Sequence, residues 1–238
     1  MDILKGIINE IKKFKRTGIL AMTIMSSIVF ISFQGLLGLI ASSVDETNIY
    51  VTALSLYFRL FLPVILSLFI SISFYNEKKA SGILMYYYHA VSLTKVFRNK
   101  IWTFYIQGIA VYIFCMGFAM FFITLEGGNP FIYVINNYNG VLYSVVGIMI
   151  LTNIQLLLVT LSDNPILSLL VALVCAIGNF FVASTNLWLF FPWSYPYRML
   201  YHTSVSSDQI IILIVILVIS FLALLLSKHK FEKNMLFG

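Results

Sequence analysis

The chain has 238 residues, of which 61% are hydrophobic and only 10% are charged, and its mean hydropathy is +0.96. Soluble domains are about half apolar and a quarter charged, so this composition excludes an ordinary soluble protein. The net charge of +6 does not indicate nucleic-acid binding, because the basic residues sort by membrane side, as shown below. The sequence predicts an all-α, polytopic membrane protein that forms a single domain over residues 1–238.

The first segment, residues 1–16, is amphipathic. Its apolar residues recur at helical spacing on one face, and lysine, arginine and asparagine fill the rest. A basic amphipathic helix of this kind lies in the membrane interface and prefers anionic lipid head groups. The alternative is a soluble helix packed on another domain. We expect an interfacial helix with membrane lipids as its partner.

Six apolar runs follow, each long enough to cross a bilayer as a helix. Within the second run, Pro63 removes a backbone hydrogen bond and is expected to kink the helix. In the fourth run, Asn153 and Gln155 are expected to form hydrogen bonds between helices. The predicted spans are residues 17–40, 49–74, 101–125, 140–161, 166–184 and 209–226.

Two features lie toward the side of the membrane opposite residues 1–16. Arg59 falls inside the second span, where an arginine indicates a functional site; the alternative is that its long side chain reaches the nearby head groups. Residues 185–208 are rich in aromatic residues and interrupted by two prolines. Irregular backbone at membrane depth must be buried in protein or line a cavity, so we predict an extracellular re-entrant segment. An ordinary interfacial loop is the alternative.

The basic residues indicate how the chain is oriented. All of them except Arg59 and Arg198 lie in residues 1–16, residues 75–100 or the tail that follows residue 226. Cytoplasmic segments carry an excess of lysine and arginine. We therefore predict that both termini and the loop over residues 75–100 are cytoplasmic, in a multi-pass protein of a bacterial plasma membrane.

The sequence contains none of the common catalytic patterns. It has no G-x-x-x-x-G-K-[ST] phosphate loop, no H-E-x-x-H and no G-x-S-x-G. Nothing in it indicates a metal site or a cofactor. The acidic residues lie near the ends of the predicted spans rather than within them, which disfavours a transporter driven by protons or sodium. We expect that the chain is not an enzyme and that a transporter of this design needs an outside source of energy.

Residues 75–100 form the only long polar interruption that carries several charges. Its interior, residues 83–91, is apolar and aromatic, which predicts that it presses against a partner. This layout resembles the membrane subunit of an ABC-2 type ATP-driven exporter. In that family the cytoplasmic loop between spans two and three begins with an acidic residue and a pair of small residues, one of them glycine. The matching positions here are Glu77, Ser81–Gly82, Leu84, Met85, Ala90–Val91–Ser92 and Lys100, with Ala90 in place of the usual proline.

The resemblance implies that separate subunits bind ATP and form the path through the membrane. Two copies of a separate ATPase subunit would bind ATP and Mg²⁺, and one would dock under the loop of each permease. A second permease subunit would complete the exporter, as a homodimer or a heterodimer. The residues that the resemblance assigns to ATPase contact, in a coupling helix between spans two and three, are Glu77, Lys79, Ser81, Gly82, Leu84, Met85, Tyr86 and Tyr88.

The small size of the chain and its segment Phe191–Pro196 are similar to permeases of bacteriocin-immunity and phenol-soluble-modulin exporters. This similarity implies an amphipathic antimicrobial or cytolytic peptide as cargo. Export of a lipid, glycan or drug stays open, as do a stand-alone secondary transporter or channel and the choice between immunity and secretion. An intramembrane enzyme is disfavoured. The residues expected along the substrate path or at an outer gate are Arg59, Trp188, Phe191, Trp193, Tyr195 and Tyr197.

Overall fold

A computed structural model describes most of the chain, and every regular element in the described part is helical, with no strand. The described residues are 2–15, 18–41, 54–79, 92–125, 127–136, 138–162, 164–201 and 207–237. The elements are α1 (Asp2–Lys15), α2 (Ile19–Ala41), the π-helix η1 (Tyr57–Phe61), α4 (Leu62–Lys79), α6 (Leu93–Leu125), α7 (Pro130–Asn136), α8 (Tyr138–Leu161), α9 (Pro165–Val182), the 3₁₀-helices η2 (Asn186–Phe190) and η3 (Pro192–Ser194), α10 (Tyr195–Tyr201) and α11 (Ser207–Phe237).

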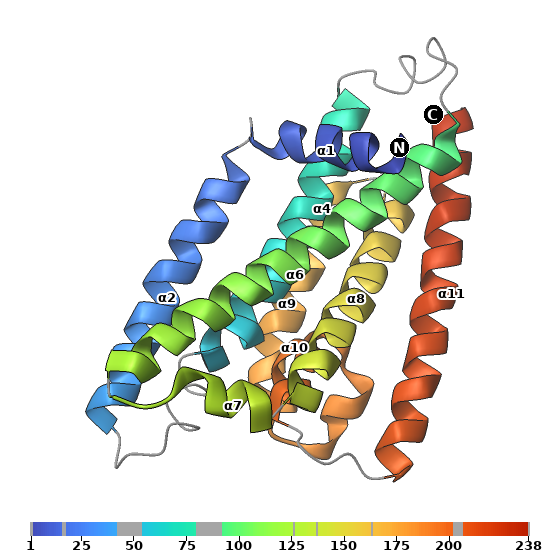
Figure 1. Cartoon of the computed structure of the whole chain (residues 1–238). Coiled ribbons are helices and arrows are strands. Elements are labelled where there is room, and N and C mark those ends of the chain that lie inside the picture. Colours follow the sequence, from blue (N-terminus) through green and yellow to red (C-terminus); the bar gives the residue numbers. More distant parts are fainter. Residues whose placement is uncertain are drawn as a thin grey trace.

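The long helices form a bundle whose two ends differ (Figure 1). Helix α1 lies across one end, where both chain termini also lie, together with the end of α4 and the start of α6. We call this the α1 end. Helices α7 and α10 lie at the other end, which we call the α10 end. Gly18 connects α1 to α2 with a φ of +70°, a left-handed conformation that glycine adopts without steric cost.

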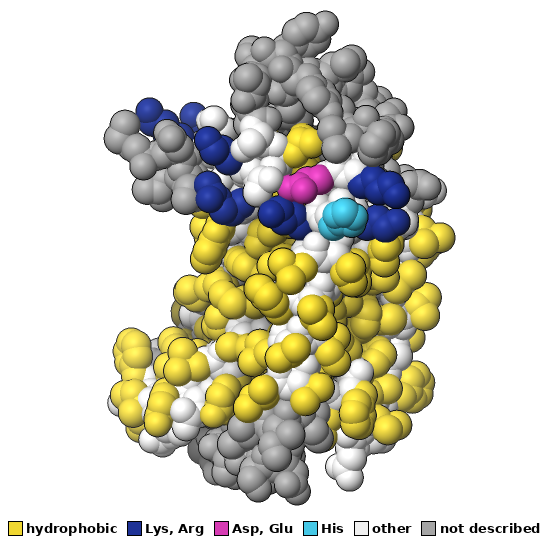
Figure 2. Space-filling model, turned by 90° about the vertical axis from the view of Figure 1, so that its right-hand side faces the viewer, with side chains coloured by type: hydrophobic (Ala, Val, Ile, Leu, Met, Phe, Trp, Pro, Cys, Tyr) yellow, Lys and Arg dark blue, Asp and Glu magenta, His cyan; other side chains and the backbone are white. Residues whose placement is uncertain are grey.

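Four helical stretches are long and apolar enough to cross a membrane by length and composition: Leu54–Asn76, Leu93–Leu125, Tyr138–Leu161 and Ile214–Lys233. In the described residues, α2 and α9 offer shorter apolar stretches, Thr23–Phe33 and Ile166–Val182. Figure 2 shows a hydrophobic body with a band of basic side chains near one end. The structure is therefore an all-helical membrane protein with four candidate spans, and six spans stay a prediction.

Helices α4, α6 and α11 extend beyond the predicted spans. Helix α4 continues to Lys79 and α6 begins at Leu93, so part of the loop predicted over residues 75–100 is helical. Helix α11 likewise continues through the predicted tail to Phe237. The physical reason is that a helix satisfies its own backbone hydrogen bonds and that lysine, arginine and glutamate are good helix formers, so it need not end where the apolar run ends.

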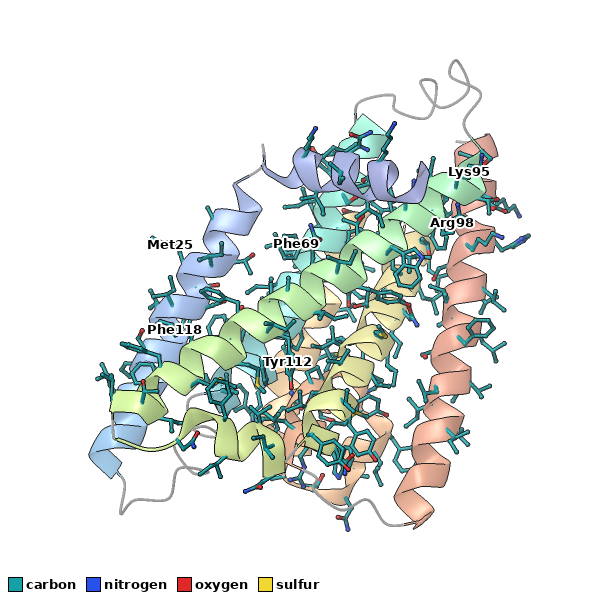
Figure 3. The ribbon with its side chains drawn as sticks, viewed as in Figure 1. Met25, Phe69, Lys95, Arg98, Tyr112 and Phe118 are labelled. Atoms are coloured by element: carbon teal, nitrogen blue, oxygen red, sulfur yellow. The ribbon has the colours of Figure 1, made fainter. Side chains whose placement is uncertain are left out.

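The interior of the bundle is aromatic where η1 meets α6. Tyr57, Phe58 and Tyr112 are fully buried, and the rings of Phe58 and Tyr112 stack with centroids 5.3 Å apart. Figure 3 shows Tyr112 on α6 inside the bundle, whereas Met25 on α2 lies at its edge, where 65% of the residue is exposed. Such exposed apolar side chains are expected on a surface that faces lipid.

Polar side chains join the helices at mid-bundle. Gln155 on α8 donates from Nε2 to the hydroxyl oxygen of Ser67 on α4 at 2.6 Å and to that of Ser168 on α9 at 2.7 Å. The hydroxyl of Tyr105 on α6 donates to Oδ1 of Asn153 on α8. These contacts confirm the prediction that Asn153 and Gln155 form hydrogen bonds between helices.

Candidate functional site

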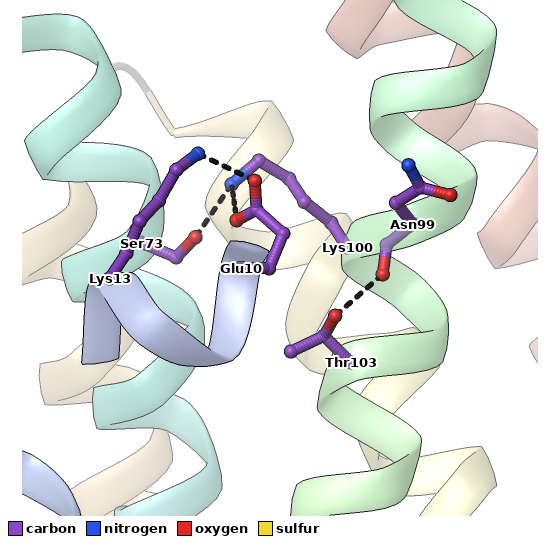
Figure 4. A network of polar contacts seen from close by, with 6 residues as sticks. All are labelled: Glu10, Lys13, Ser73, Asn99, Lys100 and Thr103. Carbon is purple, nitrogen blue, oxygen red and sulfur yellow. Dashed lines mark hydrogen bonds and ion pairs between the residues drawn. The ribbon is translucent and has the colours of Figure 1, made fainter. Parts of the chain in front are cut away.

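A buried ion network joins three helices at the α1 end (Figure 4). Lys100 of α6 donates from Nζ to the hydroxyl of Ser73 on α4 at 2.6 Å and lies 3.5 Å from Oε2 of Glu10 on α1. Glu10 also pairs with Lys13, one turn further along α1, at 2.5 Å. The side chain of Lys100 is only 1% exposed and that of Glu10 only 10%, so the contact between α1, α4 and α6 contains charge that is largely removed from solvent.

Burial and neighbouring cations act in opposite directions on Glu10. Burial disfavours the carboxylate and would raise its pKa, but the positive charges of Lys100 and Lys13 outweigh that effect and hold the pKa below its ordinary value of 4.5. Glu10 is therefore ionised at neutral pH. Since a buried charge without a partner is costly, Lys100 and Glu10 each depend on the other to remain charged where they are.

Helix α1 also packs closely against a side chain of α6 at this end. A Cβ added at Gly6 of α1 would lie 2.1 Å from Nδ2 of Asn99 on α6, so glycine allows the close approach. Figure 4 shows Asn99 one residue before Lys100 on the same helix. Helix α1 is thus fixed to α6 both by shape and by charge, while Ile7 is buried beneath it and Ile8 is 48% exposed.

The predicted coupling segment lies between the ends of α4 and α6. Glu77 and Lys79 belong to the last turns of α4. The other predicted contact residues, Ser81, Gly82, Leu84, Met85, Tyr86 and Tyr88, lie outside the described residues. The structure therefore places the ion network between the two helices that flank this segment, and it leaves the roles assigned to the segment as predictions.

At the α10 end, the helix that contains Arg59 departs from the α-helical pattern. In an α-helix the N–H of residue 63 would donate to the carbonyl of residue 59, but residue 63 is proline and has no N–H. The structure has a π-helix directly upstream, in which the N–H of Leu62 donates to the carbonyl of Tyr57. Nδ2 of Asn179 on α9 donates to the carbonyl oxygen of Arg59 at 3.0 Å. Asn179 thus supplies the hydrogen bond that Pro63 cannot.

Asn179 has a second role, because its Nδ2 also donates to the carbonyl of Trp193 at 3.1 Å. Asn179 is fully buried. A single amide therefore connects the π-helix to the aromatic segment that follows α9. π-Helical turns inside α-helices occur frequently at functional sites, and this one positions an arginine.

The side chain of Arg59 points to the aromatic segment. Its Nη2 donates to the hydroxyl of Tyr197, and its guanidinium carbon lies 3.9 Å from the centroid of the Tyr197 ring. Its Nε is buried and has no hydrogen-bond partner in the described part of the chain. Arg59 therefore packs inward on α10, and the functional role assigned to it stays a prediction.

The predicted re-entrant segment packs against the bundle as η2, η3 and α10 through Tyr201, and residues 202–206 lie outside the description. Trp188, Trp193, Tyr195 and Tyr197 are buried, and Phe191 is partly buried. The hydroxyl of Ser194 donates to the carbonyls of Trp188 and Phe191. Tyr197 thus contacts Arg59, while Trp188 packs on Tyr195 and Phe191 on Trp193. Nε1 of Trp193 is buried without a hydrogen-bond partner in the described part of the chain.

The roles of three residues in these sites, Glu10, Lys100 and Asn179, were not predicted from the sequence. Lys100 stood among the basic residues of a loop, yet it is buried, and its carboxylate partner Glu10 is far away in the sequence. Asn179 was passed over within an apolar run. The available signals were a lone glutamate within a basic amphipathic helix and a proline four residues after Arg59. Among the described residues, no group of histidine, cysteine, aspartate or glutamate is placed to hold a metal ion.

Comparisons with known proteins give one match. A family model described as an ABC-2 family transporter protein matches residues 6–179, which is more than half of the chain. No curated protein and no solved structure matches the chain. The matched range begins in α1 and ends at Asn179, and therefore includes the whole ion network and the π-helix.

Proposed function

Because the chain belongs to the ABC-2 transporter family, we propose that it is the permease subunit of an ATP-driven exporter in a bacterial plasma membrane. Six spans would place both termini and the segment between α4 and α6 in the cytoplasm. In this proposal α2 and α9 cross the membrane together with the four longer candidates. The band of basic side chains at the α1 end supports the orientation, since cytoplasmic segments carry an excess of lysine and arginine.

The observation that carries the proposed mechanism is the buried Glu10–Lys100–Ser73 network. It fixes α1 to the two helices that flank residues 80–91. An ATPase subunit docked on those residues would move α4 and α6 when it closes on ATP and Mg²⁺. Helix α1 would follow, because its carboxylate is paired with a lysine of α6. Two ATPase copies and a second permease subunit, identical or different, would complete the exporter.

The opposite end is proposed as the outer gate. Helix η1 and α4 are continuous, so a displacement of α4 at the α1 end would reach Arg59. Arg59 is in contact with Tyr197, and Asn179 is bonded to the carbonyls of Arg59 and Trp193. Movement of η1 would change these contacts and with them the position of the aromatic segment.

We propose an amphipathic peptide of antimicrobial or cytolytic type as the cargo. Aromatic side chains offer a large apolar contact area without requiring one sequence. Trp188, Trp193, Tyr195 and Tyr197 are buried in this structure and would supply such surfaces when the proposed gate opens. A lipid, glycan or drug exporter would use the same membrane architecture. The cargo must therefore be identified by experiment.

The first experiment is a pull-down of the tagged chain from its native cell in mild detergent, with the co-purifying proteins identified by mass spectrometry. We expect an ATPase subunit in a near-equal amount. A variant with Glu77→Ala and Gly82→Ala tests the predicted docking segment, and Val218→Ala on the exposed face of α11 is the matched control. A folded, membrane-bound protein without an ATPase partner would overturn the proposal in favour of a secondary transporter or channel.

The cargo is tested with the purified permease–ATPase complex in liposomes. We expect an amphipathic helical peptide to stimulate ATP hydrolysis, and a peptide of the same composition without an apolar face to have no effect. Arg59→Met should reduce this stimulation while leaving ATPase association unchanged. Stimulation by a lipid or glycan but by no peptide would contradict the proposed cargo while leaving the permease assignment intact.

A further inference from the structure

An apolar cavity of about 270 Å³ lies where α1, α2 and α6 meet. It is larger than the cavity of about 150 Å³ that binds benzene when it is engineered into a soluble protein. Ile11 of α1, Ile24 of α2 and Ile106, Ala110 and Phe114 of α6 contribute to its lining. Of these, Ile24, Ile106 and Phe114 are 47%, 42% and 38% exposed, so the cavity borders the surface of the bundle that faces hydrocarbon.

One polar side chain in the lining is without a partner. Gln107 of α6 is only 6% exposed, and neither Nε2 nor Oε1 of its amide has a hydrogen-bond partner in the described part of the chain. A buried amide without partners is costly, because both its donor and its acceptor have lost water. Gln155, a second buried glutamine, has three hydrogen-bond contacts from its Nε2, and only its Oε1 is without a partner in the described part of the chain. Both amide atoms of Gln107 are covered in this conformation, and a rotation of the Gln107 side chain, which lines the cavity, would present them to a ligand there.

The position of the cavity indicates what that ligand is. Helix α1 forms one side of it, and α1 carries the exposed lysines Lys5 and Lys12, the latter directly after Ile11. Gln107 lies two turns beyond Lys100 on α6, about 10 Å along the helix axis, and α6 is inclined (Figure 1). From the lysines inward, the site therefore offers positive charge, then an amide, then apolar walls.

A glycerophospholipid has the complementary order of groups: a phosphate, then ester carbonyls, then acyl chains. We propose that the cavity binds one acidic phospholipid of the leaflet in which α1 lies. An acyl chain occupies the apolar cavity, Nε2 of Gln107 donates to an ester carbonyl, and the lysines of α1 attract the acidic head group. Water of the glycerol region donates to Oε1 of Gln107. The lipid then stabilises the position of α1 against α2 and α6.

The proposal is tested by counting bound lipid. The full-length protein is reconstituted into vesicles that contain equal amounts of phosphatidylglycerol and phosphatidylcholine, extracted again in mild detergent and analysed by native mass spectrometry. We expect the wild-type protein to retain phosphatidylglycerol. Gln107→Leu should reduce retention about fivefold, which corresponds to one hydrogen bond of ordinary strength. Ala110→Phe, which fills the cavity, should reduce it further.

Val218→Phe is the matched control, because it adds the same ring on the exposed face of α11, where Val218 is 54% exposed. Its lipid retention should equal that of the wild type. If Ala110→Phe does not fold, as judged by its thermal unfolding, Gln107→Leu decides the question because it adds no bulk. Equal retention in all variants would overturn the proposal, as would equal retention of the two lipids. A peptide in place of the lipid, lost when the cavity is filled, would overturn it in favour of a cargo site.

Discussion

The two ends of the bundle are held together by different forces. At the α1 end, Glu10 and Lys100 form an ion pair with little exposure to solvent. At the α10 end, Asn179 satisfies backbone carbonyls, and Arg59 packs on the ring of Tyr197 without a carboxylate partner in the described residues. The α1 end therefore depends on an ion pair, whereas the α10 end depends on the hydrogen bonds of a neutral amide and on an arginine that packs against a tyrosine.

Because of this difference, we expect substitutions and changes of pH to affect the stability of the two ends differently. A buried ion pair is strongly destabilised when one partner is removed, because the other charge stays buried. Neutral hydrogen bonds between membrane helices are weaker and largely independent of pH. In the proposed exporter, the ATPase subunit moves the α1 end and the gate opens at the α10 end. Strong contacts at the α1 end would transmit the movement, and weaker contacts at the α10 end would allow the gate to open. The following variants break one end at a time.

The largest effect is expected for Glu10→Gln. This change leaves Lys100 buried without its carboxylate, and we expect a loss of about 3 kcal/mol in stability. Thermal unfolding in detergent measures the loss, and a cysteine placed in α1 should react faster with a water-soluble maleimide. Asn9→Gln, on the exposed side of the same helix, is the control and should change stability by less than about 0.5 kcal/mol.

The double variant Glu10→Gln with Lys100→Met sharpens this test. Methionine has an unbranched apolar side chain that fills space without a charge. The pair of changes should recover most of the stability that Glu10→Gln loses, since no buried charge remains without a partner. If the double variant were less stable than Glu10→Gln alone, the ion pair would not be what holds α1 in place.

At the α10 end, Asn179→Leu should cost about 2 kcal/mol, because the carbonyls of Arg59 and Trp193 both lose their donor. Pro63→Ala in the same background restores an N–H four residues after Arg59. It should recover part of the loss by returning the carbonyl of Arg59 to an α-helical hydrogen bond. Tryptophan fluorescence during thermal unfolding follows both variants. No rescue by Pro63→Ala would contradict the role assigned to Asn179.

Acidification should affect only the α1 end. The pKa of Glu10 is lower in the folded protein than its ordinary value of 4.5, so its contribution to stability is fully present above that value. The contribution is lost as the pH falls through the folded pKa. Hydrogen exchange measured below pH 4.5 should show weaker protection in α1 but unchanged protection in α9 and η1. The variant Glu10→Gln should show no such dependence in α1.

The smallest effects are expected at two glycines that permit close approach. A Cβ at Gly147 on α8 would lie 3.0 Å from Cβ and 3.1 Å from the backbone carbon of Tyr195, so Gly147→Ala should cost about 1 kcal/mol. At Gly6 the obstacle is the end of the Asn99 side chain, which can turn away. Gly6→Ala should be near neutral, because alanine also favours the helix. Equal losses at both sites, measured by thermal unfolding, would contradict this contrast.

Much of the fold was predictable because apolar runs of helical length leave few alternatives in a membrane. The runs at residues 17–40 and 140–161 correspond closely to α2 and α8. The helix ends were not predictable from hydropathy. Residues such as Lys95 and Arg98 are compatible with either a loop or a helix, and they lie in the first turns of α6 (Figure 3).

The candidate sites were predictable where a residue is unusual in its own segment. Arg59 within an apolar run is such a case, and so is the aromatic segment over residues 185–208. The partners were not predictable, because they are distant in the sequence. Pro63 shows by itself that the carbonyl of Arg59 lacks a donor, but only the fold places Asn179 beside it. In the same way, only the fold pairs Glu10 with Lys100.

The length of α6 has a consequence for how the protein sits in a bilayer. Its 33 residues extend about 50 Å at 1.5 Å per residue, whereas the hydrocarbon core is about 30 Å thick. The helix accordingly crosses the bundle at an incline (Figure 1), and inclined helices become more upright as a bilayer thickens. Since Lys100 and Gln107 both lie on this helix, we expect bilayer thickness to change its tilt and, with it, how firmly α1 is held.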